Sequence, residues 1–286
     1  MNQGADLVVA SRADAASWHA RLELGYERCA ERTVLTSRSH VGPLVVQKSL
    51  YPEGDAVCQN IVVHPPGGMV GGDRLALDVE LASRAHAQLT TPGAAKWYRS
   101  SDATAHQSID LHVAAGAALE WLPQEAILFN GAIAEFAIRI EVDPQAVFIG
   151  WDIVCLGRTA AGERFARGQL RQRIELWRDG ALWWCERAVL TGDAPLLASP
   201  VGLIGQPVFG TLLAAAPQVS DELLAACKSV AVAGGEAAVT RLPALLVARY
   251  RGASAASARD YFTALWRTLR PALIGRDAVP PRIWST

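Results

Sequence analysis

The sequence predicts a mainly β fold, with one large domain of stacked antiparallel or mixed β-sheets and two α-helices toward the C-terminus. Apolar residues alternate with polar ones over most of the chain, which is the period of a strand with one buried face. Glycine and proline interrupt these runs at short intervals, as they do in turns between strands. Hydrophobic residues make up 51% of the 286 residues and charged residues 19%, a balance that supports a large folded core.

The strands are predicted from apolar residues at every second position. Single faces are formed by Val57, Gln59, Ile61 and Val63, by Leu75, Leu77, Val79 and Leu81, by Ile109, Leu111 and Val113, and by Phe136, Ile138, Ile140 and Val142. This alternation indicates half-buried antiparallel strands. Asp179-Gly180 separates two further runs and favours a two-residue hairpin. Trp177, Trp183 and Trp184 flank this turn, and we expect them to pack across the strand pair.

Two segments have helical character instead. Ser220 precedes two acidic residues, as an N-cap does, and predicts a helix that continues to about Val230. From Ser257 onward, apolar residues follow helical spacing up to Pro271, where we expect the second helix to stop. The residues of that apolar stripe are Ala258, Tyr261, Phe262, Leu265 and Leu269.

Composition excludes several classes of protein. The formal net charge is −1, so the chain has no basic surface for nucleic acid. The five cysteines contain no CxxC pair and indicate reduced thiols rather than a disulfide framework or a zinc site. Neither a signal peptide nor an apolar run of about 18 residues is visible. We therefore expect a soluble cytoplasmic protein, with residues 1–17 as a flexible N-terminal segment.

A loop rich in glycine and proline is the sharpest local feature. It runs from His64 to Leu75, contains Gly67, Gly68, Gly71 and Gly72, and presents Asp73 at its end. The spacing of Gly67 and Gly72 is that of a phosphate-binding P-loop, but Asp73 and Arg74 occupy the positions that require Lys and Ser or Thr. A carboxylate there repels phosphate, so the P-loop interpretation is excluded.

Three carboxylates lie in apolar surroundings, where an unpaired charge is costly to bury. They are Asp73, Asp152 and Glu186. One interpretation pairs them with the arginines next to them in the sequence, Arg74, Arg158 and Arg187. The other interpretation places them along a water-filled internal path that attracts cations. Oxygen ligands bind such a metal weakly and would let it pass on. No pair of the six histidines has the spacing of a tight transition-metal site.

Several sequence blocks, in order, resemble the UreD family of urease accessory proteins, also called UreH. The blocks are His64–Leu75, Thr91–Ser101, Leu119–Glu125, Trp151–Arg158, Gly162–Phe165 and Pro281–Trp284. The resemblance extends from about Trp18 to the C-terminus. It implies a β-helix-like stack of sheets with two helices. It also implies a protein without catalytic residues of its own, which binds no cofactor tightly and carries nickel only transiently.

The resemblance further implies partners and a route for the metal. Proteins of this family act with UreF, and through UreF with the GTPase UreG, on urease apoprotein, and a water-filled tunnel is thought to carry nickel through UreD. By position in the family motifs, Asp73, Asp152 and Glu186 are the candidate tunnel residues. His64 and the four loop glycines are candidates for contact with a partner. Lys96, Tyr98 and Arg99 are expected to brace the loop or to meet a partner.

Two other functions remain open on the sequence. The chain is a purely structural clamp if it opens urease without conducting metal. It is an enzyme if two of the three carboxylates lie about 5–10 Å apart in a closed cleft and perform acid–base chemistry.

Overall fold

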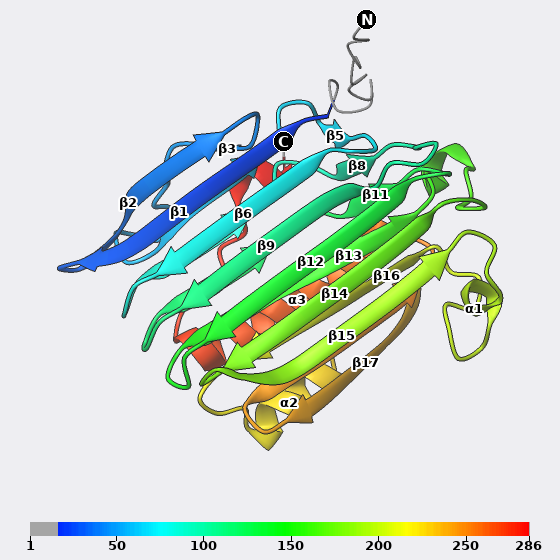
Figure 1. Ribbon diagram of the computed structural model, residues 1–286. Helices are drawn as coiled ribbons and strands as arrows, with labels where there is room; N and C mark the ends of the chain where they lie inside the picture. Colours follow the sequence, from blue (N-terminus) through cyan, green and yellow to red (C-terminus); the bar gives the residue numbers. More distant parts are fainter. Residues whose placement is uncertain (1–16, 286) are drawn as a thin grey trace, which may run out of the picture.

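The structure is a computed structural model that describes residues 17–285. The segment predicted to be flexible lies outside this range, apart from Ser17. Two large sheets lie face to face, and helices cover the outer side of one of them (Figure 1). We call the sheet without helices the first sheet and its partner the second sheet.

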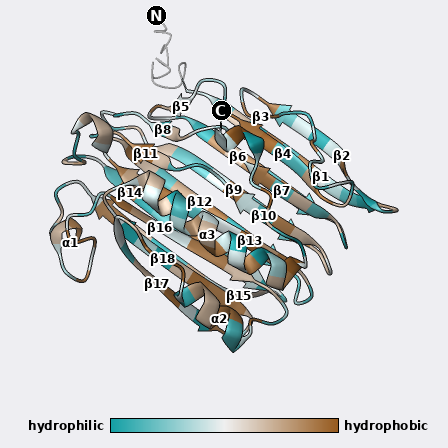
Figure 2. Ribbon diagram, turned by 180° about the vertical axis from the view of Figure 1, so that it is seen from behind, coloured by the Kyte–Doolittle hydropathy of each residue, from teal (hydrophilic) through white to brown (hydrophobic). Residues whose placement is uncertain are grey.

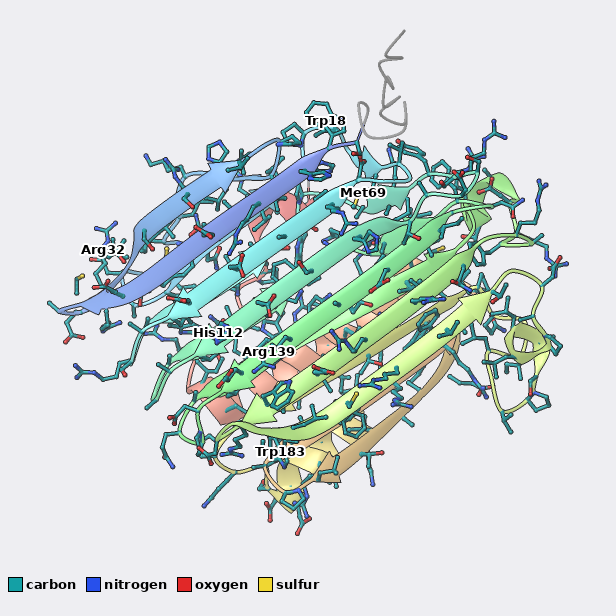
Figure 3. The ribbon with its side chains drawn as sticks, in the orientation of Figure 1. Trp18, Arg32, Met69, His112, Arg139 and Trp183 are labelled. Carbon is teal, nitrogen blue, oxygen red and sulfur yellow. The ribbon has the colours of Figure 1, made fainter. Side chains whose placement is uncertain are left out.

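The first sheet has the strand order β15-β14-β12-β9-β6-β1-β2. Its strands are β1 (His19–Cys29), β2 (Arg32–Val41), β6 (Arg74–Leu81), β9 (Ala105–Val113), β12 (Ile133–Val142), β14 (Gln169–Arg178) and β15 (Ala181–Thr191). The residues predicted to share strand faces in β6, β9 and β12 are buried as expected. One face of this sheet is open to solvent: His112 and Arg139 lie on the face turned to the viewer in Figure 3.

The second sheet has the order β17-β18-β16-β13-β10-β7-β4-β3. Its strands are β3 (Val45–Val46), β4 (Cys58–Val63), β7 (His86–Thr90), β10 (Ala118–Leu122), β13 (Val147–Leu156), β16 (Val208–Ala215), β17 (Gly235–Leu242) and β18 (Leu245–Gly252). Three short strands, β5 (Gly68–Met69), β8 (Ala95–Trp97) and β11 (Ala126–Leu128), pair with one another at its border and join it through β13.

The central strands are parallel, so the prediction that they are antiparallel is wrong. β6, β9, β12 and β14 pair in parallel in the first sheet, and β4, β7, β10 and β13 do so in the second. The chain crosses from one sheet to the other after nearly every strand, which makes successive neighbours parallel, as in a β-solenoid. Parallel strands usually read as continuous apolar runs because both faces are covered. One face of the first sheet is open to solvent, so its parallel strands alternate apolar and polar residues as the strands of an antiparallel sheet do.

The predicted hairpin and stack of sheets are confirmed. Asp179 and Gly180 both have positive φ, 52° and 71°, which a two-residue turn of this type requires. Across the strand pair, Trp177 lies opposite Leu182 and Trp184 opposite Leu176.

Helices α2 (Asp221–Lys228) and α3 (Ala255–Ile274) are the two predicted helices, and a third, α1 (Pro195–Ala198), is short. Two 3-10 turns, Thr159–Ala161 and Arg282–Ser285, complete the helical segments. The side chain of Ser220 accepts a hydrogen bond from the N–H of Leu223 and caps α2 as expected. Helix α3 does not stop at Pro271; it ends at Gly275, whose left-handed φ of 73° terminates it. The N–H of Gly275 donates to the carbonyl of Pro271, which keeps the last turn intact.

Two hydrophobic cores follow from this layering. One fills the space between the sheets, and the other lies between the second sheet and the helices. Figure 2 shows α3 lying across the second sheet. Its predicted apolar stripe is buried there. None of the helices within residues 17–285 has the length and apolarity needed to cross a membrane.

Candidate functional site

The glycine loop closes onto the carboxylate that it was predicted to present. Asp73 is 1% exposed, and its two oxygens accept hydrogen bonds from the main-chain N–H groups of Trp18 and Val70, each at 2.8 Å. Gly72 has a φ of 95°, which lets the chain turn sharply before Asp73. One oxygen of Asp73 therefore binds the backbone of its own loop, and the other binds the backbone of the residue just before β1.

Gly71 is the tightest point of this loop. A Cβ atom added there lies 2.6 Å from the carbonyl oxygen of Ala103 and also meets the side chain of Ser100. We expect Gly71→Ala to lower the free energy of unfolding by about 1–3 kcal/mol, because backbone atoms must move to admit the methyl group. Gly93→Ala is the matched control, since nothing lies within 4 Å of the added atom. Denaturant unfolding of the two variants tests this, and equal stability would contradict it.

The structure brings Asp152 and Glu186 together between the sheets. Asp152 lies on β13, in register with Thr211 of β16, which is in register with Arg249 of β18. This row of three side chains faces the first sheet. There, Gln172 donates a hydrogen bond to Asp152 from Nε2, and Glu186 of β15 meets the other two side chains.

Glu186 is held by two groups of the opposite sheet. Its Oε1 lies 3.1 Å from the hydroxyl of Thr211, which donates to it. An Nη atom of Arg249 lies 2.9 Å from its Oε2. Glu186 therefore stands at the Arg249 end of the polar row and Asp152 at the other end.

The arginine partners predicted from sequence neighbours are wrong. Arg158 pairs with Glu163 at 3.0 Å, Arg187 lies 3.7 Å from Glu175, and Asp73 binds N–H groups rather than Arg74. Adjacent residues on a strand point to opposite faces of the sheet, so Arg187 cannot reach Glu186. Gln172, Thr211 and Arg249 were missed, because only the register of distant strands brings them to the two carboxylates.

The environment of Asp152 changes its acidity. Burial raises the pKa of Asp152 to about 6; the hydrogen bond from Gln172 lowers this pKa and the charge of Glu186 raises it. At neutral pH Asp152 is therefore mostly ionised, and a cation that binds it releases few protons.

Two hollow spaces flank this polar row. A cavity of about 270 Å³ lies between the sheets; Asp152 lines it, together with His64 and Trp97. A groove of about 710 Å³ opens between β15 and β17 and is lined by Glu186, Thr211 and Arg249. The row of polar side chains thus separates an interior cavity from an open edge of the two sheets.

The far end of the cavity carries the other predicted loop residues. His64, Gly67, Gly68 and Lys96 line it, and Nε2 of His64 is buried without a hydrogen-bond partner among the described residues. Burial lowers the pKa of His64, although the charge of Asp73 opposes this effect. The imidazole is therefore mostly neutral at pH 7, and within the part of the chain that the structure describes its Nε2 makes no hydrogen bond.

Tyr98 and Arg99 lie outside the lining of the cavity. The N–H of Tyr98 donates to the carbonyl of Met69, and its ring packs edge-on against Phe129 with the centroids 4.9 Å apart. Arg99 forms an isolated bridge with Ala132. Tyr98 therefore contacts the loop through its main chain, Arg99 pairs with a segment outside it, and the bracing role stays a prediction.

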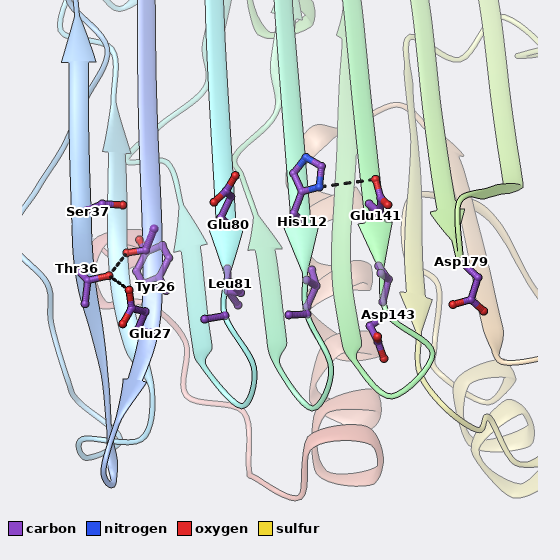
Figure 4. A pocket seen from close by; sticks show the side chains of 15 residues that line it. Tyr26, Glu27, Thr36, Ser37, Glu80, Leu81, His112, Glu141, Asp143 and Asp179 are labelled. Carbon is purple, nitrogen blue, oxygen red and sulfur yellow. Dashed lines mark hydrogen bonds and ion pairs between the residues drawn. The ribbon is translucent and has the colours of Figure 1, made fainter.

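A third hollow, of about 510 Å³, lies on the outer face of the first sheet. Figure 4 shows Glu80, Asp143 and Asp179 around it, with His112 directed at Glu141. The His112–Glu141 distance is 3.7 Å. Within residues 17–285, neither this hollow nor any other place collects three His, Cys, Asp or Glu side chains in a geometry that could hold a metal ion.

Comparison with known proteins gives one consistent result. Residues 19–285 match the family model described as UreD urease accessory protein. The chain is 53% identical over 269 residues to urease accessory protein UreD of Azoarcus sp. strain BH72, and the match covers 94% of each chain. It is 51% identical over 283 residues to the protein of the same name from Pseudomonas fluorescens strain Pf0-1, covering 98% of this chain and 100% of that one.

Proposed function

The chain belongs to the UreD family of urease accessory proteins, and on this premise we propose that it conducts nickel into urease apoprotein. Its family assigns it to urease maturation, as an accessory protein and not as an enzyme. Nickel is the cargo in this proposal, and the protein holds it only in passing.

One observation carries the proposal: Asp152 and Glu186 stand between an internal cavity and an open groove. Two carboxylates in a space walled by apolar side chains attract a cation more strongly than they would in bulk water. Carboxylate oxygens bind a late transition metal more weakly than cysteine or histidine clusters do. A cation would enter such a path readily and leave it again.

The two ends of the path differ in chemistry. At the groove, Arg249 pairs with Glu186, so an entering or leaving cation must displace the guanidinium from the carboxylate. At the cavity, the neutral imidazole of His64 offers a free nitrogen as a ligand. Asp73 has no role in this path, because both of its oxygens are used by main-chain N–H groups.

The same proposal covers the partners and the cell compartment. UreF would bridge this chain to UreG, while this chain would contact urease apoprotein, in the cytoplasm. The path then requires one partner at the groove and another near the glycine loop.

Reconstituted maturation of urease tests this function. We expect urease apoprotein mixed with UreF, UreG, GTP and nickel to bind at least ten-fold more nickel when this chain is present. The readout is the nickel content of repurified urease. Equal nickel content with and without the chain would exclude a role in delivery.

A further inference from the structure

The two edge strands of the first sheet, β2 and β15, differ in how far other segments of the chain cover them. At the β2 edge, the N–H of Thr33 donates to the carbonyl of Asp55, and the hydroxyl of Tyr51 donates to the carbonyl of Thr33. The segment between β3 and β4 of the second sheet therefore covers part of this edge. At the opposite edge, no strand of residues 17–285 pairs with the outer side of β15.

The exposed edge of β15 has few of the features that prevent strand addition. Edges are commonly protected by charged residues, proline or bulges. β15 contains no proline, its only bulge lies near the hairpin, and pairing with β14 is regular from Thr191 to Trp184. Glu186 is already paired with Arg249, while Leu182 and Val189 are 45% and 59% exposed.

The groove that contains Glu186 lies directly beside this edge and also has apolar lining residues. β15 and β17, the end strands of the two sheets, lie near each other in Figure 1, and the groove of about 710 Å³ between them is lined by Leu190, Leu203 and Phe209. Val201, on the loop that borders the groove, is 91% exposed. A strand added to β15 would direct every second side chain into this groove.

The outer face beside β15 is basic. Arg171, Arg173 and Arg187 lie on the paired strands β14 and β15. Glu175 lies 3.4 Å from Arg173 and 3.7 Å from Arg187, and Arg171 is in register with Glu135 of β12. Arg173 and Arg187 therefore share one carboxylate, and Arg187 lies on the edge strand itself, which favours an acidic side chain in a partner.

We propose that an extended segment of a partner protein, with apolar side chains alternating with acidic ones, pairs with β15 and closes this edge. Main-chain hydrogen bonds to β15 would supply affinity. Apolar side chains would enter the groove, and acidic side chains would lie beside Arg187. The partner would then stand next to Glu186, at the groove end of the proposed path. The inference rests on the proposed function in one respect: the partner is taken to be a protein that takes part in urease maturation.

Two valine variants test this docking edge. Val189→Asp places a carboxylate on β15 next to the expected position of the partner's acidic side chains, which it would repel. Val41→Asp makes the same change on β2, where Val41 is 68% exposed. We expect Val189→Asp to weaken binding to urease apoprotein with UreF and UreG by ten-fold or more, and Val41→Asp to leave it unchanged. Binding is measured by biolayer interferometry.

Hydrogen exchange identifies the occupant directly. Complex formation should slow exchange of the amides of residues 182–190 by ten-fold or more and leave those of β2 unchanged. A complex that forms without protecting β15 overturns the inference alone. Protection that appears in the isolated chain and rises with its concentration identifies a second copy as the occupant and also overturns it. If no complex forms, the proposed function fails and the inference fails with it.

Discussion

Asp152→Asn should reduce delivery of nickel to urease by ten-fold or more while the accessory complex still assembles. Unit charges 4 Å apart attract by about 4 kcal/mol at an effective dielectric constant of 20, and a loss of 1.4 kcal/mol is a factor of ten. The amide has nearly the shape of the carboxyl group and can still bond to Gln172, so packing is preserved. Nickel content of repurified urease is the readout, with size-exclusion chromatography to confirm assembly.

Asp78→Asn is the matched control for this substitution. Asp78 also lies on a strand, and burial raises its pKa as it does that of Asp152, but it pairs with Arg21 and does not line the cavity. Glu186→Gln should resemble Asp152→Asn. If both path variants load urease as fully as the control does, the chain acts as a structural clamp and does not conduct the metal.

The pH dependence provides a second readout of the same group. Burial raises the pKa of Asp152 from 3.8 to about 6, so delivery should fall as the pH drops below 6 and the carboxyl group becomes protonated. Because the folded state holds this proton more tightly than the unfolded state, the contribution of Asp152 to stability rises as the pH falls from about 6 to 4. A loss of delivery in that range therefore does not result from unfolding caused by this group.

The sequence predicted where the strands are but not how they pair. Alternation of apolar residues in β6, β9 and β12 identified their buried faces correctly, because this alternation depends only on which face of the strand is exposed to solvent. Parallel pairing depends on the chain crossing between the sheets, and no sequence repeat marks the successive crossings. Pro271 was misplaced as a helix end because Gly275, four residues later, provides the cap.

The candidate site was predicted in part for the same reason. Asp152 and Glu186 were identified by a local signal, a carboxylate within an apolar run. Their partners lie on other strands: Gln172 is 20 residues from Asp152, and Arg249 is 63 residues from Glu186. Such contacts depend on register between strands, which neighbouring residues in the sequence do not encode.

A buried ionic network was missed entirely, although one of its members lies in a block that resembles the UreD family. Glu120 of β10 accepts hydrogen bonds from Nε1 of Trp266 at 2.6 Å and Nε of Arg270 at 2.9 Å, and its other oxygen lies 2.7 Å from His86. Burial alone would raise the pKa of Glu120, but the contacts with His86 and Arg270 outweigh it and the net pKa is lowered. Glu53 binds the other side of Arg270 at 2.7 Å.

Arg270→Ala should therefore lower the free energy of unfolding by about 3–5 kcal/mol, because it leaves the carboxylates of Glu120 and Glu53 buried without their cation. Arg270 is 0% exposed and joins α3 to the second sheet. It also donates to the carbonyl of Asp277, so the variant should loosen the segment after the helix. Denaturant unfolding monitored by tryptophan fluorescence measures the loss.

Arg267→Ala is the control, since this arginine lies on the same helix but is exposed. Adding Glu120→Gln to Arg270→Ala should recover part of the loss, because the second change removes one of the two unpaired charges. This recovery separates the cost of an uncompensated carboxylate from the cost of lost side-chain volume, which Glu120→Gln cannot repair. If Arg270→Ala is no less stable than Arg267→Ala, water must solvate both carboxylates in the variant, and the network does not fix α3 to the sheet.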